Sequence, residues 1–224
     1  MEKHVVAIDK IKHVTHDVKQ FNYKKPDGYE FEPGQATEVS INKEGWKEAN
    51  HPFTFTCLNE DPYLQFTIKI YNDHNGLTEQ IGKLEEGDEF IIHDVWGTIN
   101  YKGPGVFLAG GAGVTPFIAI LRQQAKAGKI GDNKLIFSNK TEDDIILKDE
   151  FEEILGDNFI PVITDEPTDN HLFLDGFIDK EFLESQIDDF NQPFYVCGPP
   201  PFMDAMLGYL KDLGADPEGL VFEE

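Results

Sequence analysis

The regular alternation of strands and helices after residue 105 limits the possible folds more than any other feature. Five short apolar runs are typical of strands: VFLAG (106–110), KLIFSN (134–139), IPVIT (160–164), PFYVCG (193–198) and LVFE (220–223). Four helical segments lie between them: TPFIAILRQQAKAG (115–128), LKDEFEEIL (147–155), DKEFLESQI (179–187) and PPFMDAMLGYLKDLG (200–214). Because strand–helix–strand units pair their strands in parallel, this half predicts an α/β doubly wound parallel sheet.

The first hundred residues follow a different pattern, in which apolar and polar positions alternate. This alternation predicts strands within the segments 3–23, 36–41, 52–58, 64–71 and 89–95, with one short helix near 77–84. Several short strands joined by turns favour a small closed barrel. We therefore predict a six-stranded antiparallel β-barrel domain over residues 1–101 and an α/β domain over residues 104–224, with a linker at 101–105.

The most informative stretch joins an apolar strand to a helix through a glycine-rich turn. It contains Gly110, Gly111, Ala112, Gly113, Thr115 and Pro116. Glycine lets the main chain approach a ligand closely, and Thr-Pro is a favourable helix start. The free N–H groups of a helix N-terminus attract phosphate. We predict a pyrophosphate site here, although a tight turn without a ligand would use the same residues.

A second signal lies where another strand ends, at Cys197-Gly198-Pro199, followed closely by a helix that carries Met203. Ligands of open α/β sheets bind beyond the carboxyl ends of the strands. We expect this loop and the glycine loop to share that edge. Taken alone, Cys197 is more often an inert buried cysteine than a functional one.

Charge and cysteine content exclude several classes of protein. With 42 acidic and 19 basic residues the net charge is −23, so we expect no binding to nucleic acid or to an anionic membrane. Two cysteines cannot hold a four-thiolate iron–sulfur cluster. His13 and His16 have no second pair of ligands nearby, so no metal is expected. The sequence has no secretion signal and no long apolar run, and the expected location is the cytoplasm.

Four motifs in order resemble the ferredoxin–NADP reductase superfamily over essentially the whole chain. The stretches GGAGVTP and VCGPPPFM are similar to its nucleotide loop and its Cys-Gly-Pro segment. The stretch His51-Pro52-Phe53-Thr54 resembles the variant of the Arg-x-Tyr-Ser/Thr motif found in ferric reductases and NADPH oxidases. Gly76-Leu77-Thr78 is similar to the Gly-x-x-Ser/Thr helix start, one residue shorter.

The resemblance implies FAD in the barrel domain and NADH or NADPH in the second domain. By carry-over, His51 approaches the flavin pyrophosphate, Phe53 packs on the flavin or its ribityl chain, and Thr54 hydrogen-bonds flavin N5. Thr78 and nearby N–H groups hold phosphate. The full set of predicted flavin residues is His51, Pro52, Phe53, Thr54, Lys69, Tyr71, Gly76, Leu77 and Thr78. Singly, each could instead be a core, strand or solvated residue.

Two departures from the family pattern bear on the flavin. His51 replaces the usual arginine and is mostly neutral at pH 7 unless a phosphate raises its pKa, which favours weaker FAD binding or FMN in its place. The family often ends in an aromatic residue that covers the flavin, whereas this chain ends at Phe222-Glu223-Glu224, with Phe222 typical of a strand residue. We therefore expect an uncovered flavin.

The segment after the second parallel strand should reach the adenosine ribose, as in other dinucleotide folds. Here Ser138, Asn139 and Lys140 precede the acidic residues 142–144. A 2′-phosphate is usually met by arginine, and Arg122, in the helix after the glycine loop, is the one arginine in the chain. The acids disfavour a dianion, so we predict NADH, unless these acids simply cap the next helix.

Together these features predict an NAD(P)H-dependent flavoprotein reductase. Hydride would pass from nicotinamide C4 to flavin N5 in the cleft between the domains, with Thr54 and Cys197 at the point of transfer. Electrons would continue to a carrier such as flavodoxin or ferredoxin. The acidic charge counts against an acidic carrier, unless a basic patch exists, for example around Lys43 and Lys47. The alternatives are reduction of small acceptors such as ferric complexes or quinones, and a non-catalytic relay subunit.

Overall fold

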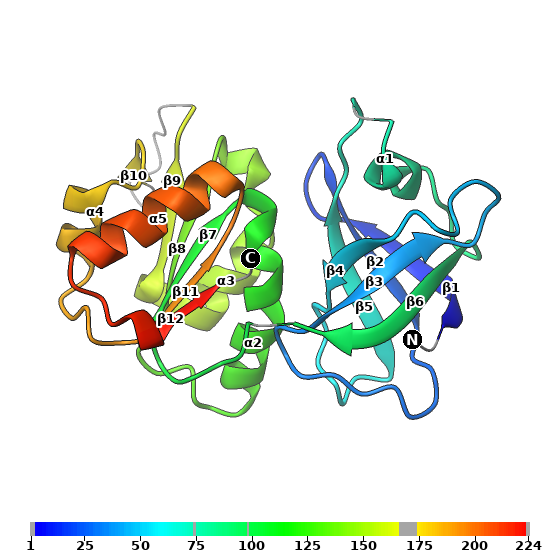
Figure 1. The fold of residues 1–224 in the computed structure, drawn as a ribbon, viewed down its shortest axis with the longest axis horizontal. Coiled ribbons are helices and arrows are strands. Elements are labelled where there is room, and N and C mark those ends of the chain that lie inside the picture. Colours follow the sequence, from blue (N-terminus) through cyan, green and yellow to red (C-terminus); the bar gives the residue numbers. More distant parts are fainter. Residues whose placement is uncertain (1–2, 74, 98, 166–173, 223–224) are drawn as a thin grey trace. The chain divides into compact units, whose positions relative to one another are not determined.

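The computed structural model describes residues 3–73, 75–97, 99–165 and 174–222 (Figure 1). The chain divides into two compact units that are not simple halves of the sequence. The barrel unit contains residues 1–98 together with 115–123, and the parallel-sheet unit contains residues 99–114 and 124–224. The first part of the helix after the glycine loop therefore groups with the barrel.

The barrel unit is a six-stranded antiparallel sheet, as predicted. Its strands run in the order β4-β3-β6-β1-β2-β5, and an isolated antiparallel bridge joins Phe55, just after β4, to Phe66 on β5. One helix, α1 (Leu77–Gly82), follows β5. The strands are β1 (His4–His13), β2 (Val18–Lys24), β3 (Ala36–Ile41), β4 (His51–Thr54), β5 (Tyr63–Lys69) and β6 (Glu89–Trp96).

Aromatic rings fill the inside of the barrel. Phe21, Tyr23, Phe66 and Phe90 are fully buried and contact one another, mostly edge to face. Phe21 and Tyr23 lie at alternate positions of β2, because side chains two residues apart share one face of a strand, and Phe66 and Phe90 come from β5 and β6. The hydroxyl of Tyr23 has no hydrogen-bond partner in this core.

The other face of β2 and β5 carries a buried polar cluster, made of Gln20, Thr56, Gln65 and Thr67. The Gln65 Oε1 accepts hydrogen bonds from Gln20 Nε2 at 3.2 Å and from Thr56 Oγ1 at 3.0 Å. Arg122 on α2 (Thr115–Lys126) completes the cluster, donating from Nη1 to the Thr56 carbonyl and, at 3.0 Å, to Gln65 Oε1. Such a cluster explains why residues 115–123 group with the barrel.

The parallel-sheet unit contains six strands in the order β10-β9-β8-β7-β11-β12, and every neighbouring pair is parallel. The predicted doubly wound sheet is confirmed. The strands are β7 (Val106–Gly110), β8 (Lys134–Asn139), β9 (Phe159–Ile163), β10 (Leu174–Asp175), β11 (Phe194–Cys197) and β12 (Leu220–Phe222). The other helices are α3 (Lys148–Leu155), α4 (Lys180–Gln186) and α5 (Pro200–Asp212).

Both faces of this sheet are covered, as β7 illustrates. Val106 and Leu108 belong to a core cluster with residues of α4 and α5, including Leu183 and Leu210. Aromatic side chains cover the other face, where Phe151 of α3 meets Phe137 of β8 edge to face. Figure 1 shows α5 running across the sheet. The strand order reverses between β7 and β11, which is where ligands of doubly wound sheets bind.

Two details of the chain path differ from expectation. Strand β10 was not predicted, because its two residues are too short to give a periodic signal. The expected strand 220–223 ends at Phe222, with Glu223 and Glu224 outside the described residues, and Phe222 packs against the core. None of the described helices has the length and apolar character needed to cross a lipid bilayer.

The expected linker is an ordered part of the parallel-sheet unit. The hydroxyl of Tyr195 accepts hydrogen bonds from the backbone N–H groups of Lys102, at 2.8 Å, and Gly103, at 3.1 Å. Tyr101 also stacks on the Tyr195 ring, at 5.9 Å between centroids. Burial raises the pKa of Tyr195. Polar and aromatic contacts therefore pin a segment whose composition alone suggests flexibility.

Candidate functional site

The glycine loop begins where β7 ends and leads directly into α2. Gly111 has φ +52°, a left-handed conformation that favours glycine. Residues 111–114 form a 3₁₀ turn (η1, Gly111–Val114), so the helical path starts before Thr115, the predicted N-cap. Thr115 and Pro116 are instead the first two residues of α2. The loop thus presents the N-terminus of a helix, as a phosphate site requires.

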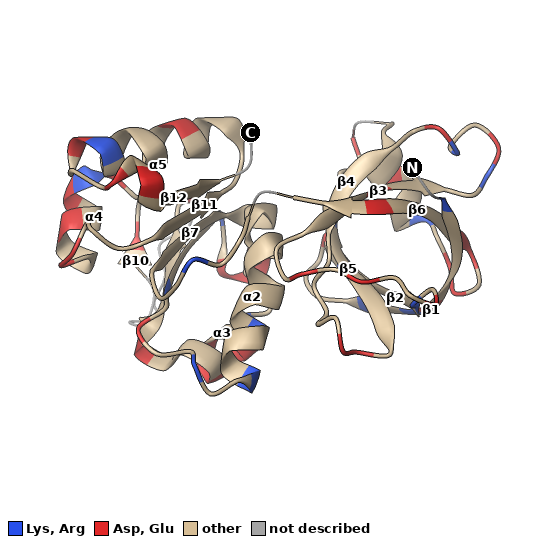
Figure 2. Ribbon diagram, turned by 60° about the horizontal axis from the view of Figure 1, so that its bottom comes forward, with Lys and Arg blue, Asp and Glu red and all other residues tan. Residues whose placement is uncertain are grey.

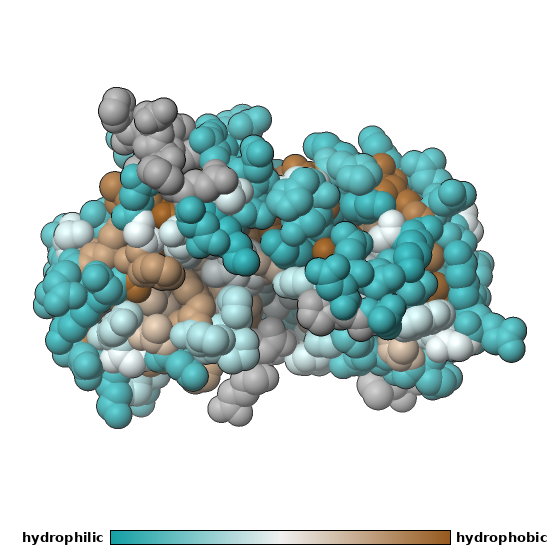
Figure 3. Space-filling model, turned by 90° about the horizontal axis from the view of Figure 1, so that it is seen from above, coloured by the Kyte–Doolittle hydropathy of each residue, from teal (hydrophilic) through white to brown (hydrophobic). Residues whose placement is uncertain are grey.

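The Cys197 loop ends a strand beside the glycine loop, as expected. In the register of β11 and β7, Cys197 lies opposite Ala109, and in that of β7 and β8, Gly110 lies opposite Ser138. The three strand ends therefore meet at the carboxyl edge of the sheet, and Gly198 follows Cys197 there. Figure 3, which views the molecule from above, shows apolar surface among hydrophilic side chains on the parallel-sheet unit.

Glycine is required where the two loops meet. A β-carbon on Gly113 would lie 2.3 Å from the carbonyl oxygen of Cys197 and 2.6 Å from the Cα of Gly198. Because these are backbone atoms, rotation of a side chain could not make room for the β-carbon. The close approach leaves loop backbone exposed at the strand ends, and the half-buried Gly111, Ala112 and Gly113 line it. This arrangement fits an extended anionic ligand such as a nucleotide pyrophosphate.

The predicted ribose segment lies at the same edge, at the end of β8. Ser138 is half-buried, Lys140 is exposed, and Asn139 is buried with its Oδ1 lacking a hydrogen-bond partner. Two of the acidic residues that follow in the chain, Glu142 and Asp144, contact nearby residues of the same segment. Asp144 Oδ2 accepts a hydrogen bond from the Thr141 N–H at 3.0 Å, and Glu142 forms an ion pair with Lys148 at 2.7 Å.

Glu142 and Asp144 therefore cap and brace the 3₁₀ turn η2 (Glu142–Asp144), which is the alternative considered for them from the sequence. Their engagement weakens the charge argument against NADPH. Glu142 is paired with a cation, whereas Asp143 and Asp144 keep their negative charges and would repel a 2′-phosphate.

The predicted flavin motif occupies β4. His51 and Pro52 are exposed, while Phe53 and Thr54 are half-buried. Phe53 packs against the barrel core, with its ring centroid 6.0 Å from that of Phe66, so part of its surface serves the core. β4 is the end strand of the sheet order and, among the described residues, pairs along its length with β3 only. The other edge of β4 faces β5, to which the chain is bridged just after β4 at Phe55 and Phe66.

The other predicted flavin residues surround the end of β5 and the start of α1. Lys69 forms an ion pair with Asp17 at 3.0 Å, and Tyr71 is 45% exposed. Gly76 is the N-cap residue of α1 and offers no side-chain cap, Leu77 is buried, and Thr78 is half-buried. An exposed aromatic and an uncapped helix start fit a cofactor with a ring system and phosphates.

A carboxylate already lies at this helix start. Glu79 Oε2 accepts a hydrogen bond from the N–H of Asn75 at 3.0 Å, and its other oxygen is 2.7 Å from Lys83 Nζ. The hydrogen bond from Lys83 lowers the pKa of Glu79. Any phosphate at α1 must therefore share the positive end of the helix with an ionised side chain.

Two residues that sequence reasoning did not select contribute to these regions. Phe202, on α5, places its ring against both Gly110 and Gly198. Its signal was its position just after the Cys-Gly-Pro segment, which also drew attention to Met203, half-buried on the same helix. Arg122 was considered only as a phosphate-binding residue. It instead donates hydrogen bonds to Thr56 and Gln65 of the buried polar cluster. No local pattern indicates that role.

Two protein-family descriptions match the chain, one in each half. Residues 4–90 match the family described as FAD-binding domain, and residues 107–207 match the oxidoreductase NAD-binding domain. These matches support the predicted cofactors, FAD together with NADH or NADPH. They cover β4 in the first half and both the glycine and Cys197 loops in the second.

The curated relatives are similar in sequence at a distance. The chain is 26% identical over 234 residues to the reductase component of propane 2-monooxygenase from Rhodococcus jostii, covering 97% of this chain and 62% of that protein. It is 32% identical over 195 residues to NADH-cytochrome b5 reductase 1 from Mycosarcoma maydis, covering 81% of this chain and 59% of that protein. The chain thus spans about three fifths of these relatives.

Solved structures share the fold along the whole chain. The FAD/NAD-binding domain of nitric oxide dioxygenase from Vibrio cholerae superposes with a TM-score of 0.86 at 21% identity, covering 98% of this chain and 97% of that one. A ferredoxin–NADP⁺ reductase from Neisseria gonorrhoeae gives 0.85 at 20% identity, covering 100% and 98%. With both domain families matched and this two-unit fold, the chain belongs to the ferredoxin–NADP reductase superfamily.

Proposed function

We propose that this chain takes a hydride from NADH or NADPH onto FAD and passes the electrons to a carrier protein. The observation that carries the proposal is the junction of the glycine loop with the Cys197 loop at the reversal of strand order. That junction supplies a helix N-terminus and close backbone approach, which are the requirements for a dinucleotide.

The residues divide the work as follows. Gly110, Gly111, Gly113 and the N–H groups at the start of α2 hold the nucleotide pyrophosphate, and Ser138 to Lys140 face the adenosine ribose. The edge of β4 with Thr54, and the start of α1 with Thr78, hold FAD. When bound, FAD supplies the chemistry that takes two electrons as hydride and releases them singly. Cys197 and Thr54 flank the transfer, orienting the nicotinamide and hydrogen-bonding the flavin ring.

The electron acceptor is proposed on chemical grounds. A one-electron carrier such as flavodoxin or ferredoxin is our first candidate. Residues 1–98 contain 10 basic and 18 acidic residues and residues 99–224 contain 9 and 24, so the second half would repel an acidic carrier more strongly. Figure 2 shows acidic residues on both units. Lys43, named as a possible basic patch, is neutralised by Asp88 at 2.7 Å.

A haem protein is the second candidate acceptor, because several relatives are named NADH-cytochrome b5 reductase. The same names favour NADH, which is also our proposal for the nucleotide. We further propose that the protein acts in the cytoplasm.

The absorption spectrum of the purified protein tests the flavin. A yellow protein that releases FAD on denaturation is expected, and Phe53→Ala should retain FAD about 1–3 kcal/mol less tightly through lost stacking. A protein that stays colourless after incubation with FAD or FMN contradicts the proposal. Oxidation of NADH with ferricyanide as acceptor then separates an enzyme from a relay subunit.

Kinetics test the nucleotide and the transfer residues. We expect a higher kcat/KM for NADH than for NADPH, and a clear reversal would overturn the preference. Cys197→Ala should slow anaerobic flavin reduction while FAD content stays constant, whereas an unchanged rate makes Cys197 a packing residue. Reduction of a flavodoxin, a ferredoxin and a cytochrome b5, compared at equal ionic strength, identifies the class of acceptor.

A further inference from the structure

The ring of Phe202 lies against the backbone of both loops at the carboxyl edge. A β-carbon on Gly198 would lie 2.6 Å from Phe202 Cδ1, and one on Gly110 would lie 3.0 Å from its Cγ and 3.2 Å from both Cδ atoms. The Gly198 β-carbon would also lie 3.3 Å from the Cα of Gly110. The ring thus touches the last residue of β7 and the first residue after β11.

This position gives the glycines a second purpose. At Gly110 and Gly198 the neighbour that excludes a β-carbon is the Phe202 ring, whereas at Gly113 it is backbone. Phe202 is half-buried, and its inner side packs against the core of the parallel-sheet unit. The ring lies between the core and the two glycine backbones, so it supports both strand ends, and its two rotatable side-chain bonds leave it few alternative positions.

We propose that Phe202 is a positioning residue for the nicotinamide nucleotide, acting through the two loops against which its ring packs. This inference rests on the proposed function, since it assumes that those loops bind NADH or NADPH. A smaller side chain leaves a void under Gly110 and Gly198, and the loops can then shift into the space that the ring occupied. A displacement of about 1 Å can lower the rate of a positioned reaction about 100-fold.

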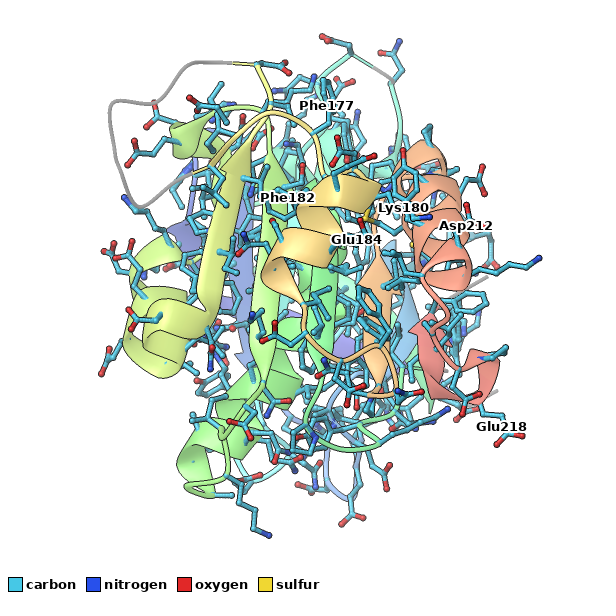
Figure 4. The ribbon with its side chains drawn as sticks, turned by 90° about the vertical axis from the view of Figure 1, so that its left-hand side faces the viewer. Phe177, Lys180, Phe182, Glu184, Asp212 and Glu218 are labelled. Atoms are coloured by element: carbon cyan, nitrogen blue, oxygen red, sulfur yellow. The ribbon has the colours of Figure 1, made fainter. Side chains whose placement is uncertain are left out.

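Phe182 provides a matched control. It is also a half-buried phenylalanine packed against the same core, but it lies on α4 (Figure 4), and the atoms nearest to a β-carbon added at Gly110 or Gly198 do not include its own. If Phe202 serves only the core, Phe202→Ala and Phe182→Ala will lower the melting temperature alike and leave nucleotide use unchanged. If Phe202 positions the loops, nucleotide use changes in the Phe202 variant alone.

The experiment measures, for each variant with FAD bound, the NADH concentration dependence of anaerobic flavin reduction. For Phe202→Ala we expect the limiting rate to fall at least about tenfold while FAD content stays within about twofold of wild type, with Phe202→Leu intermediate. Phe182→Ala should reduce flavin at the wild-type rate. Equal rates in Phe202→Ala and wild type, or equal losses in the two alanine variants, would overturn the proposal.

A compensating pair of substitutions tests the contact itself. Gly110→Ala places a methyl group against the ring and should impair flavin reduction, and Phe202→Ala makes room for that methyl group. The double variant should therefore be faster than the product of the two single losses predicts, by at least about fivefold, as expected for residues in contact. Simple multiplication of the losses would contradict the contact. If the wild-type protein reacts with neither NADH nor NADPH, the proposed function is wrong, and the proposal for Phe202 is rejected with it.

Discussion

In the parallel-sheet unit the glycine loop comes from residues that are adjacent in sequence, whereas in the barrel unit the predicted flavin residues are assembled from distant segments. Gly110 to Pro116 run straight from β7 through η1 into α2. The residues predicted to bind the flavin come from β4, the end of β5 and the start of α1. A local motif therefore suffices in one unit, while the other depends on strand pairing.

The interiors of the two units also differ in the kind of contact that they contain. The barrel encloses aromatic rings together with buried ionisable groups, among them Tyr23, Tyr29 and Cys57. It also carries the Gln20–Gln65 polar cluster on its other face. In the parallel-sheet unit the critical contacts are between backbones, at Gly113 and Cys197. We infer that the barrel is destabilised mainly by changes in the charge or polarity of its buried groups. The parallel-sheet unit should be affected mainly by changes in side-chain volume.

High pH should produce the largest effect, and should unfold the barrel first. Burial raises the pKa of Cys57 from 9.0 to about 12 and that of Tyr29 from 10.0 to about 12. Both groups are neutral when protonated, so the stability from Cys57 is complete below pH 9 and is lost as pH rises toward 12. Cys57 alone would account for about 4 kcal/mol, at 1.36 kcal/mol for each pKa unit.

Both tryptophans, Trp46 and Trp96, lie in the barrel unit, so their fluorescence follows it alone. Hydrogen exchange measured by mass spectrometry follows both units. Cys57→Ala removes the thiol and should shift the barrel transition to higher pH. If the parallel-sheet unit loses its protection against hydrogen exchange before the barrel does, the predicted order of unfolding is wrong.

A methyl group at Gly113 should damage the parallel-sheet unit next most strongly. It would lie 2.3 Å from the Cys197 carbonyl oxygen, and such overpacking costs about 3 kcal/mol. We expect Gly113→Ala to weaken NADH binding roughly 100-fold, a change that corresponds to about 3 kcal/mol. The FAD content should be unchanged. Titration with NADH measures the effect.

Gly208 is the control for Gly113→Ala. It lies within α5 with nothing within 4 Å of its added β-carbon. Gly208→Ala should stabilise the protein by about 0.5–1 kcal/mol, because alanine is the better helix former. Wild-type NADH affinity in Gly113→Ala would show that the loops have room to separate.

Loss of Arg122 should destabilise the barrel by an intermediate amount. Arg122→Met keeps most of the length of the side chain but removes the hydrogen bonds to the Thr56 carbonyl and to Gln65. A hydrogen bond from a charged group contributes about 1.5–3 kcal/mol, and we expect a loss of about 2 kcal/mol in urea unfolding followed by tryptophan fluorescence. Gln123→Ala, an exposed neighbour on α2, should change nothing measurable.

The smallest effect should come from the unpartnered hydroxyl of Tyr23. A buried hydroxyl without a hydrogen bond is unfavourable, so Tyr23→Phe should leave stability unchanged or raise it by up to about 1 kcal/mol. Tyr29→Phe is the contrast, because its hydroxyl donates to the His93 carbonyl at 2.6 Å. That variant should lose about 1 kcal/mol. A larger loss in Tyr23→Phe would show that its hydroxyl has a partner.

Periodicity and turn residues predicted most elements to within a few positions. The strand over 106–110 and the strand over 134–139 have their predicted bounds, because apolar runs between glycine- or lysine-rich turns are unambiguous. Strand β10, with two residues, lies below the length at which a period can be detected. The helix expected over 115–128 ends at Lys126, two residues early.

What the sequence determined by itself is the order of the elements, the two fold classes and the position of the glycine loop, since each follows from residues close together in the chain. Tertiary structure decided which atoms meet. Only pairing β11 beside β7 brings Cys197 to Gly113 and Phe202 to Gly110, and only folding α2 with the barrel brings Arg122 to Gln65. Spacing along a chain carries no information about contacts between residues 57 or 84 positions apart, because those depend on how the strands pack.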